Sequence, residues 1–171
     1  MISEKMQTAI NEQIKLEEQS SRIYLAMASW CEANGYPGAA AFLFEHSDEE
    51  RMHMLKFVHY LNDRGGYARL LPLEQTPAEF RSLKEIFEDT LNHERLVTTR
   101  INLLLKLAIE EDDYTTAIFL QWYVTEQLEE ESLIKTILDK LSLAGEERGG
   151  LFHIDKELSA MAAASSAKLP G

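Results

Sequence analysis

The chain has 171 residues, of which 45% are hydrophobic and 27% are charged, with eight Gly and four Pro. This composition is typical of one globular, helix-rich domain and excludes a disordered or fibrous chain. The formal net charge of −12 argues against nucleic acid and anionic membranes as partners, and it favours the attraction of small cations.

Three further features predict a cytoplasmic protein. The first ten residues, MISEKMQTAI, lack the uninterrupted apolar run of a secretion signal. The one cysteine, Cys31, cannot form a disulfide within the chain, which favours a reducing compartment. No stretch reaches the roughly 18 uncharged apolar residues that a membrane helix needs.

Four long segments have helical periodicity, and Gly and Pro cluster between them. They span residues 4–33, 38–64, 82–110 and 114–142. Ser82 and Glu85 form a capping-box pattern at the start of the third segment, and Asp113 is the expected N-cap of the fourth.

A shorter fifth helix is predicted over 150–161, where apolar residues recur at helical spacing. The Ala- and Ser-rich residues 163–171 are expected to form a flexible C-terminal tail. The domain is therefore expected to end near residue 162.

The connections between the long helices predict how they are arranged. Short turns join the first helix to the second and the third to the fourth, so each pair should form an antiparallel hairpin. Each helix would be about 40–45 Å long at ~1.5 Å per residue. The link over 65–81 can span roughly 50 Å when extended, which is the length of such a bundle. We therefore expect an all-α four-helix bundle with one long crossover connection.

Each long helix has one carboxylate near the middle of its apolar face. These four acids are Glu17, Glu50, Glu94 and Glu130. A mid-helix residue lies at the same height whichever way its helix runs, so the four side chains should converge at the centre of the bundle. Four ionised carboxylates cannot share a dry core without compensation. The apolar faces hold no Arg or Lys that could supply it, because the nearby basic residues fall off them: Arg51, Lys56, Arg95 and Lys135.

A pair of divalent cations would neutralise these carboxylates. His53 lies three residues after Glu50 on the same helix face, and its nitrogen suits iron better than calcium or magnesium. His46 also falls on this apolar face. A single Glu-x-x-His pattern occurs by chance in many helices, so the prediction of a metal site depends on the four acids together. A polar core network without metal is the alternative.

With these residues the chain resembles the ferritins, most closely the bacterial non-haem ferritins. The resemblance covers residues 3–161 approximately, and it is carried by Glu17 with Tyr24, EERMH (49–53), NHE (92–94), LQWYVTEQLEEE (120–131) and LDKLSLAG (138–145). It implies a ferritin-like bundle with a short fifth C-terminal helix, and self-assembly into a 24-subunit shell. It also implies a ferroxidase that oxidises Fe(II) with O2 or H2O2 and stores Fe(III) as a mineral inside the shell.

The resemblance implies a di-iron ferroxidase centre. Glu17, Glu50 and His53 would hold the first iron. Glu50 as a bridge, Glu94 and Glu130 would hold the second, with Gln127 nearby. Tyr24 would form a hydrogen bond at the centre or take part in electron transfer.

Bacterial members of the family add a third iron site. Its expected acids are Glu49, Glu126 and Glu129, with Glu130 shared between sites. Without the family pattern, the first three would be read as an ordinary solvated acidic face. Trp122 lies beside the centre in the family, and packing is the alternative role for it.

Differences between this sequence and related di-iron families favour the non-haem ferritins. Bacterioferritins and rubrerythrins have a second Glu-x-x-His on the fourth helix, where this chain has Gln127-Leu-Glu-Glu130. Bacterioferritins also place a haem-ligating Met where this chain has Arg51. Met52 is one position further on, about 100° round the helix, so no haem is expected.

The sequence also bears on the routes by which iron would enter a shell. Ala117 and Leu120 occupy positions where animal ferritins have acids at a three-fold pore, which puts an acidic three-fold route in doubt. His153 and Asp155 on the fifth helix would line a four-fold axis or occupy ordinary surface positions.

Two other functions remain open at this point. One is a small di-iron oxidase or peroxidase that acts on a substrate other than iron. The other is a non-catalytic helical protein whose acids only bind cations. Retention of iron by a large shell would exclude the first, and oxygen consumption on addition of Fe(II) would exclude the second.

Overall fold

The computed structural model describes residues 1–145 and 147–166, which form five α-helices and no strand. The helices are α1 (Glu4–Ala33), α2 (Pro37–Asp63), α3 (Leu83–Glu110), α4 (Tyr114–Ala144) and α5 (Arg148–Ser166). The predicted all-α fold is confirmed, and the bounds of the first four helices differ from the prediction by at most two residues.

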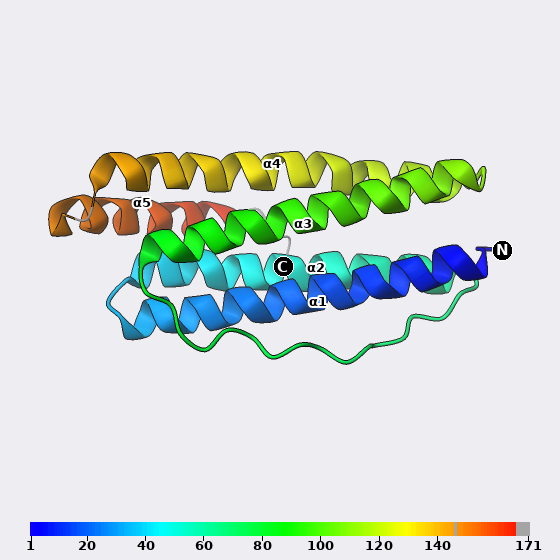
Figure 1. The fold of residues 1–171 in the computed structure, drawn as a ribbon, viewed down its shortest axis with the longest axis horizontal. Helices are drawn as coiled ribbons and strands as arrows, with labels where there is room; N and C mark the ends of the chain where they lie inside the picture. The colour runs from blue at the N-terminus through cyan, green and yellow to red at the C-terminus, as the bar shows by residue number, and fades with distance from the viewer. Residues whose placement is uncertain (146, 167–171) are drawn as a thin grey trace.

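Two antiparallel hairpins, α1–α2 and α3–α4, pack into the four-helix bundle (Figure 1). The crossover over residues 64–82 runs the length of the bundle alongside α1, as predicted. Side chains of α1 bind its backbone: Asn11 Oδ1 accepts from the N–H of Arg69 at 2.7 Å, and Gln19 Oε1 accepts from the N–H of Glu74 at 2.8 Å. These contacts satisfy backbone groups that regular structure would otherwise pair.

The predicted N-caps of α3 and α4 are confirmed, but the Glu85 carboxylate accepts from the N–H of Arg81 and not, as the predicted capping box would require, from that of Ser82. Ser82 Oγ accepts from the N–H of Glu85 at 3.1 Å, and Asp113 Oδ1 accepts from the N–H of Thr116 at 3.1 Å. Each contact satisfies one of the N–H groups that the first turn of a helix leaves without a partner.

The start of α2 is capped from another helix. The residue before it, Tyr36, makes no side-chain cap. Instead the carboxylate of Asp155, on α5, accepts from the N–H groups of Gly38 at 3.0 Å and Ala39 at 2.8 Å. Asp155 therefore joins two helices of one subunit, while His153 is exposed and lies 3.2 Å from the carboxylate of Glu157.

Helix α5 is longer than the predicted 150–161 and runs back beside α2 and α4 (Figure 1). Residues 163–166, which we assigned to the tail, continue this helix. Alanine is the strongest helix former, which explains the extension through AAASS. The rest of the predicted tail, 167–171, lies outside the described residues, so the domain boundary at 162 stays a prediction.

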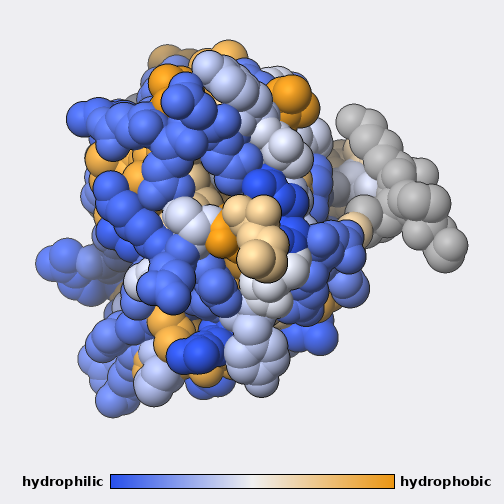
Figure 2. Space-filling model, turned by 90° about the vertical axis from the view of Figure 1, so that its right-hand side faces the viewer, coloured by the Kyte–Doolittle hydropathy of each residue, from blue (hydrophilic) through white to orange (hydrophobic). Residues whose placement is uncertain are grey.

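The core consists of two apolar clusters with a polar layer between them. One cluster contains Tyr24 and Phe87, and the other contains Phe57 and Ile101. The outer surface at the end of the bundle that holds the N-terminus is mostly hydrophilic, with scattered apolar side chains (Figure 2). Within residues 1–145 and 147–166, no helix is both long and apolar enough to cross a bilayer.

Candidate metal centre

Four buried carboxylates, one from each long helix, occupy the polar layer between the apolar clusters. Their exposed fractions are 1% for Glu17, 2% for Glu50, 0% for Glu94 and 7% for Glu130. No Arg or Lys is buried in the described part of the chain. The polar layer therefore has the acidic composition predicted from the helix faces, and histidines are its only basic side chains among the residues described.

Glu17, Glu50 and His53 form the first group with metal-binding geometry, each offering one ligand atom within 4.8 Å of the others. His53 Nδ1 lies 3.7 Å from Glu50 Oε2. Gln13 donates to Glu17 Oε1 at 2.7 Å, but Glu17 Oε2 and Glu50 Oε2 are buried and lack a hydrogen-bond partner. Buried oxygens without partners are costly, and a cation held by the two carboxylates and the imidazole would satisfy both.

Burial raises the pKa of the Glu17 and Glu50 carboxyls well above the ordinary value of 4.5. Repulsion from a neighbouring carboxylate raises each pKa further: Glu50 acts on Glu17, and Glu94 acts on Glu50. The cost of ionising these groups without a counter-charge explains both shifts. A divalent cation is the counter-charge that this donor set suits.

Glu94 is held through both of its carboxylate oxygens. The Tyr24 hydroxyl donates to Oε1, and Gln127 Nε2 donates to Oε2 at 3.0 Å and to the Glu94 backbone carbonyl at 3.2 Å. Burial nevertheless raises the pKa of the Glu94 carboxyl. Tyr24 thus lies at the centre and contacts it through Glu94, which is the hydrogen-bonding role expected from the resemblance.

Glu130 has a partner that the sequence interpretation did not assign, His46. His46 Nε2 lies 3.1 Å from Glu130 Oε2, and its Nδ1 lies 3.2 Å from the carbonyl of Phe42. Both contacts are hydrogen bonds at once only if both ring nitrogens carry protons. Burial by itself would lower the pKa of His46, but the hydrogen bond and charge of Glu130 raise it to about 9. The pair also lowers the pKa of Glu130 below its ordinary value, although burial acts the other way.

The acids expected at a third site line one cavity of about 500 Å³ between α2, α4 and α5. The second group with metal-binding geometry consists of His46, Glu49 and Glu130, with ligand atoms within 4.8 Å of one another. Glu126 Oε1 lies 3.9 Å from His53 Nε2, and Glu129 lines the same cavity. The four expected acids therefore line one cavity, and the imidazole of His46 lines it with them.

The end of α5 closes one side of this cavity. Ser165 Oγ donates to Glu49 Oε1 at 2.7 Å, and Met161 also lines the wall. No sequence signal marked this contact, because it depends on how far α5 extends.

Trp122 and Leu120 lie on opposite sides of α4. Trp122 packs edge-on against His53, with ring centroids 5.2 Å apart, and Lys56 Nζ lies 3.3 Å above its ring. Leu120 is fully buried in the apolar core. Position 120 therefore faces the interior of its own subunit, whereas the neighbouring Ile118 is 73% exposed.

Comparisons with known proteins agree with this geometry. A family model described as a Ferritin-like domain matches residues 7–144. A bacterial non-heme ferritin of Escherichia coli O6:H1 is 48% identical over 161 residues, which covers 94% of this chain and 98% of the relative. The corresponding protein of Campylobacter jejuni is 41% identical over 162 residues, covering 95% and 97% of the two chains.

Solved structures show the same likeness. The crystal structure of an open-pore ferritin from the archaeon Archaeoglobus fulgidus matches with a TM-score of 0.91 and 42% identity. The match covers 92% of this chain and 96% of the archaeal one.

Proposed function

The chain belongs to the ferritin family, and from this premise we propose that it is a cytoplasmic iron-storage protein with ferroxidase activity. One observation carries the proposal. Glu17 Oε2 and Glu50 Oε2 are buried beside His53 without a hydrogen-bond partner, in a core layer where the described residues include no Arg or Lys. A cation held by the two carboxylates and His53 would satisfy both oxygens, and it would be the first iron of a di-iron site.

The two metal positions share one carboxylate, Glu50. Glu17, Glu50 and His53 hold the first Fe(II), and Glu50, Glu94 and Glu130 hold the second. Gln127 lies beside the second position and positions Glu94 through its amide group.

A third iron binds in the adjacent cavity, where Glu49, Glu126 and Glu129 share Glu130 with the second position. The exposed Arg51 stands at the position where haem-binding relatives have a ligand, so we propose no haem.

Iron is both the substrate and the cargo of the reaction. Two Fe(II) ions each give one electron to O2, which takes up two protons and becomes H2O2. When H2O2 is the oxidant, the same two electrons and two protons give two molecules of water. Hard carboxylate ligands favour the Fe(III) product, and the fixed carboxylates hold both ions close enough to react with one oxidant molecule.

Storage requires an enclosed space, which we propose is a shell of 24 copies. The net charge of −12 per chain attracts Fe(II) to the assembly. The acid-lined cavity beside the centre gives oxidised iron a place to move to.

The test is to load metal-free protein with excess Fe(II) in air and to follow oxygen uptake and Fe(III) absorbance. Size-exclusion chromatography then traces iron and protein together. We expect rapid oxidation and iron that co-elutes with protein at many times the 19.5 kDa chain mass. Glu130→Ala and His53→Ala should lose rapid oxidation, whereas Glu88→Ala, at an exposed position on α3, should retain it.

Other outcomes would favour the competing functions. Iron that precipitates while the protein elutes as a monomer or dimer would contradict storage and favour a small di-iron oxidase. Bound Fe(II) that is oxidised neither in air nor by added H2O2 would contradict ferroxidase activity and favour a metal-binding protein.

A further inference from the structure

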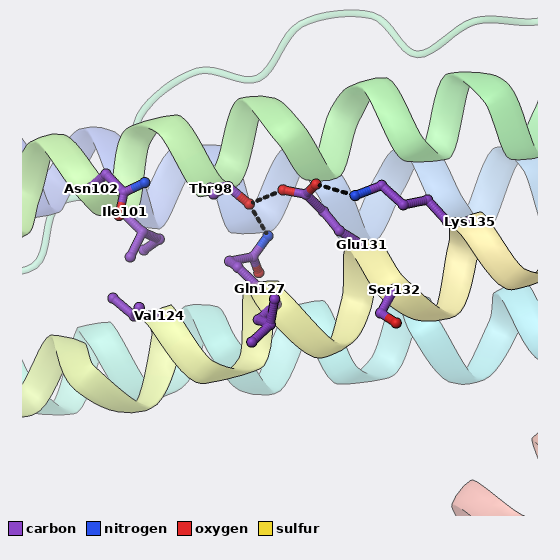
Figure 3. A pocket seen from close by; sticks show the side chains of 9 residues that line it. Thr98, Ile101, Asn102, Val124, Gln127, Glu131, Ser132 and Lys135 are labelled. Carbon is purple, nitrogen blue, oxygen red and sulfur yellow. Dashed lines mark hydrogen bonds and ion pairs between the residues drawn. The ribbon is translucent and has the colours of Figure 1, made fainter.

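A chain of hydrogen bonds connects Glu94 in the metal centre to the surface groove between α3 and α4, and Figure 3 shows its part from Gln127 to Lys135. Gln127 Nε2 donates to Glu94 Oε2 at 3.0 Å and to Thr98 Oγ1 at 3.4 Å. Thr98 Oγ1 in turn donates to Glu131 Oε1 at 2.8 Å, and Lys135 Nζ lies 3.2 Å from Glu131 Oε2. The chain thus begins at a predicted metal ligand and ends at an exposed lysine.

The direction of these hydrogen bonds is fixed at Glu131. Lys135 Nζ is paired with Glu131 Oε2, so Glu131 is a carboxylate that accepts hydrogen bonds and does not donate them. The Thr98 hydroxyl has one proton, and it uses this proton to donate its hydrogen bond to Glu131. Thr98 Oγ1 can therefore offer only lone pairs to Gln127.

The acceptor Thr98 Oγ1 and the acceptors of Glu94 together determine which end of the Gln127 amide faces α3. With the NH2 group there, it meets three acceptors: Thr98 Oγ1, the Glu94 carbonyl and Glu94 Oε2. A flipped amide would place Gln127 Oε1 against the same oxygens. Because Gln127 is only 3% exposed, water could not easily compensate for the lost hydrogen bonds.

The groove beside these residues has room for the Gln127 amide to rotate into if its hydrogen bond to Thr98 is lost. It has a volume of about 470 Å³, and Thr98, Gln127 and Glu131 line it together with the polar side chains of Asn102 and Ser132. Figure 3 shows the Gln127 nitrogen directed toward Thr98. Without the Thr98 hydroxyl, the Gln127 amide could bind either Glu94 or the polar side chains of the groove.

We propose that Thr98, held by Glu131, is a positioning residue that fixes the orientation of the Gln127 amide and, through it, the Glu94 carboxylate. Glu94 belongs only to the second metal position in the proposed function, on which this inference rests. The hydroxyl of Thr98 therefore sets the affinity of the second metal position and leaves the first unchanged.

The experiment is titration of metal-free protein with Co(II), followed by calorimetry and by visible absorption of the bound ion. Glu94→Ala first identifies the binding step that belongs to the second position. Thr98→Val then removes the hydroxyl at nearly constant shape. We expect this step to weaken about tenfold, with a changed Co(II) spectrum, while the Glu17–Glu50–His53 step keeps its affinity.

Two matched variants isolate the hydroxyl. Thr99→Val makes the same change one residue on, where the hydroxyl is exposed and donates only to the Arg95 carbonyl of its own helix, and it should bind Co(II) like the wild type. Thr98→Ser keeps the hydroxyl and should restore the second step. Glu131→Ala removes the acceptor at a partly exposed position and should weaken the same step, which tests the inference even if Thr98→Val does not fold.

The outcomes separate this inference from the proposed function. If the wild type shows no Co(II) step that Glu94→Ala abolishes, the assigned centre fails and the inference fails with it. If that step exists but Thr98→Val and Glu131→Ala bind like Thr99→Val, only the positioning role is overturned. Equal weakening in Thr98→Val and Thr98→Ser would also overturn it, because packing and not the hydroxyl would then be the cause.

Discussion

At the scale of single residues, two carboxylates of the same centre differ because of their partners. Glu50 and Glu130 are both buried, yet the pKa of Glu50 is raised well above its ordinary value and that of Glu130 is lowered. Burial raises both, and only Glu130 has a histidine within hydrogen-bond distance, His46 at 3.1 Å. In the metal-free protein His46 therefore supplies the counter-charge that Glu50 lacks.

This difference predicts the effect of His46→Ala on stability. Without metal, the variant leaves Glu130 buried and without its donor, so it should lower the free energy of unfolding by about 2–3 kcal/mol. Excess Zn(II) should reduce this loss, because a cation on Glu130 takes over the neutralising role. Denaturant unfolding of both proteins, with and without Zn(II), measures the two losses. An equal loss in both conditions would show that His46 acts through packing alone.

The sequence could predict the acids of the centre but not their pairing. Glu17 and Glu50 were recognised because a charged residue on an apolar helix face is visible from spacing alone. His46 lies on the same face of α2, but its partner is 84 positions away on α4. That contact depends on how the helices pack, which spacing within one helix does not encode. The role of Thr98 depends in the same way on Glu131, 33 positions away.

At the scale of elements, the junction of α2 with α5 depends on a glycine. An ideal Cβ on Gly38 would lie 1.8 Å from the backbone oxygen of Asp155, which is far too close for any side chain. Only glycine lets the α2 N-terminus approach α5 closely enough for the Asp155 carboxylate to cap it. The helix bounds followed from periodicity and capping residues, but this contact between elements did not.

Gly38→Ala should therefore displace α5 and remove the cap of α2. We expect a loss of stability of at least about 1 kcal/mol, the typical value of an N-cap, together with faster proteolysis within α5. Gly149→Ala is the matched control, since nothing lies within 4 Å of its added Cβ and its φ is not in the left-handed region. Equal protease sensitivity of the two variants would contradict a role for the close approach at Gly38.

Asp113, at the other end of the bundle, is expected to contribute to stability in a way that depends on pH. Burial by itself would raise the pKa of Asp113, but hydrogen bonds from Thr116 and Arg64 lower it below the ordinary 3.8. A group with a depressed folded-state pKa stabilises the fold above its ordinary pKa, and this contribution is lost as the pH falls through the lowered value.

Asp113→Asn should retain the cap but lose the charge. At pH 7 it should cost about 1 kcal/mol, because Arg64 Nη2 lies 3.1 Å from the carboxylate and the pair is only partly exposed. The difference from the wild type should vanish at an acidic pH below that lowered pKa, where the aspartate is protonated in both states. Urea unfolding at both pH values measures it, and a difference independent of pH would assign the loss to cap geometry.

At the scale of the whole molecule, one side of α4 exposes large apolar side chains beside polar ones such as Gln121 and Thr125. Tyr114, Ile118 and Leu128 lie on it at helical spacing, with exposed fractions of 66%, 73% and 72%. Isolated exposed apolar residues are ordinary, but a row of them along one helix is typical of a surface that another molecule covers. In the proposed 24-subunit shell, a neighbouring copy is the molecule that would cover it.

Charged substitutions on this face should separate assembly from folding. Ile118→Glu and Leu128→Glu change side chains that the subunit does not bury, so helix content and subunit unfolding should change little. Assembly should be impaired, because each variant would place a carboxylate in an apolar contact between copies. Light scattering with size-exclusion chromatography measures the mass of the assembly, and Asn92→Glu, at an exposed polar position on α3, is the control. If both variants form shells of wild-type mass, this face of α4 is free in the assembly, and its exposed side chains need another partner.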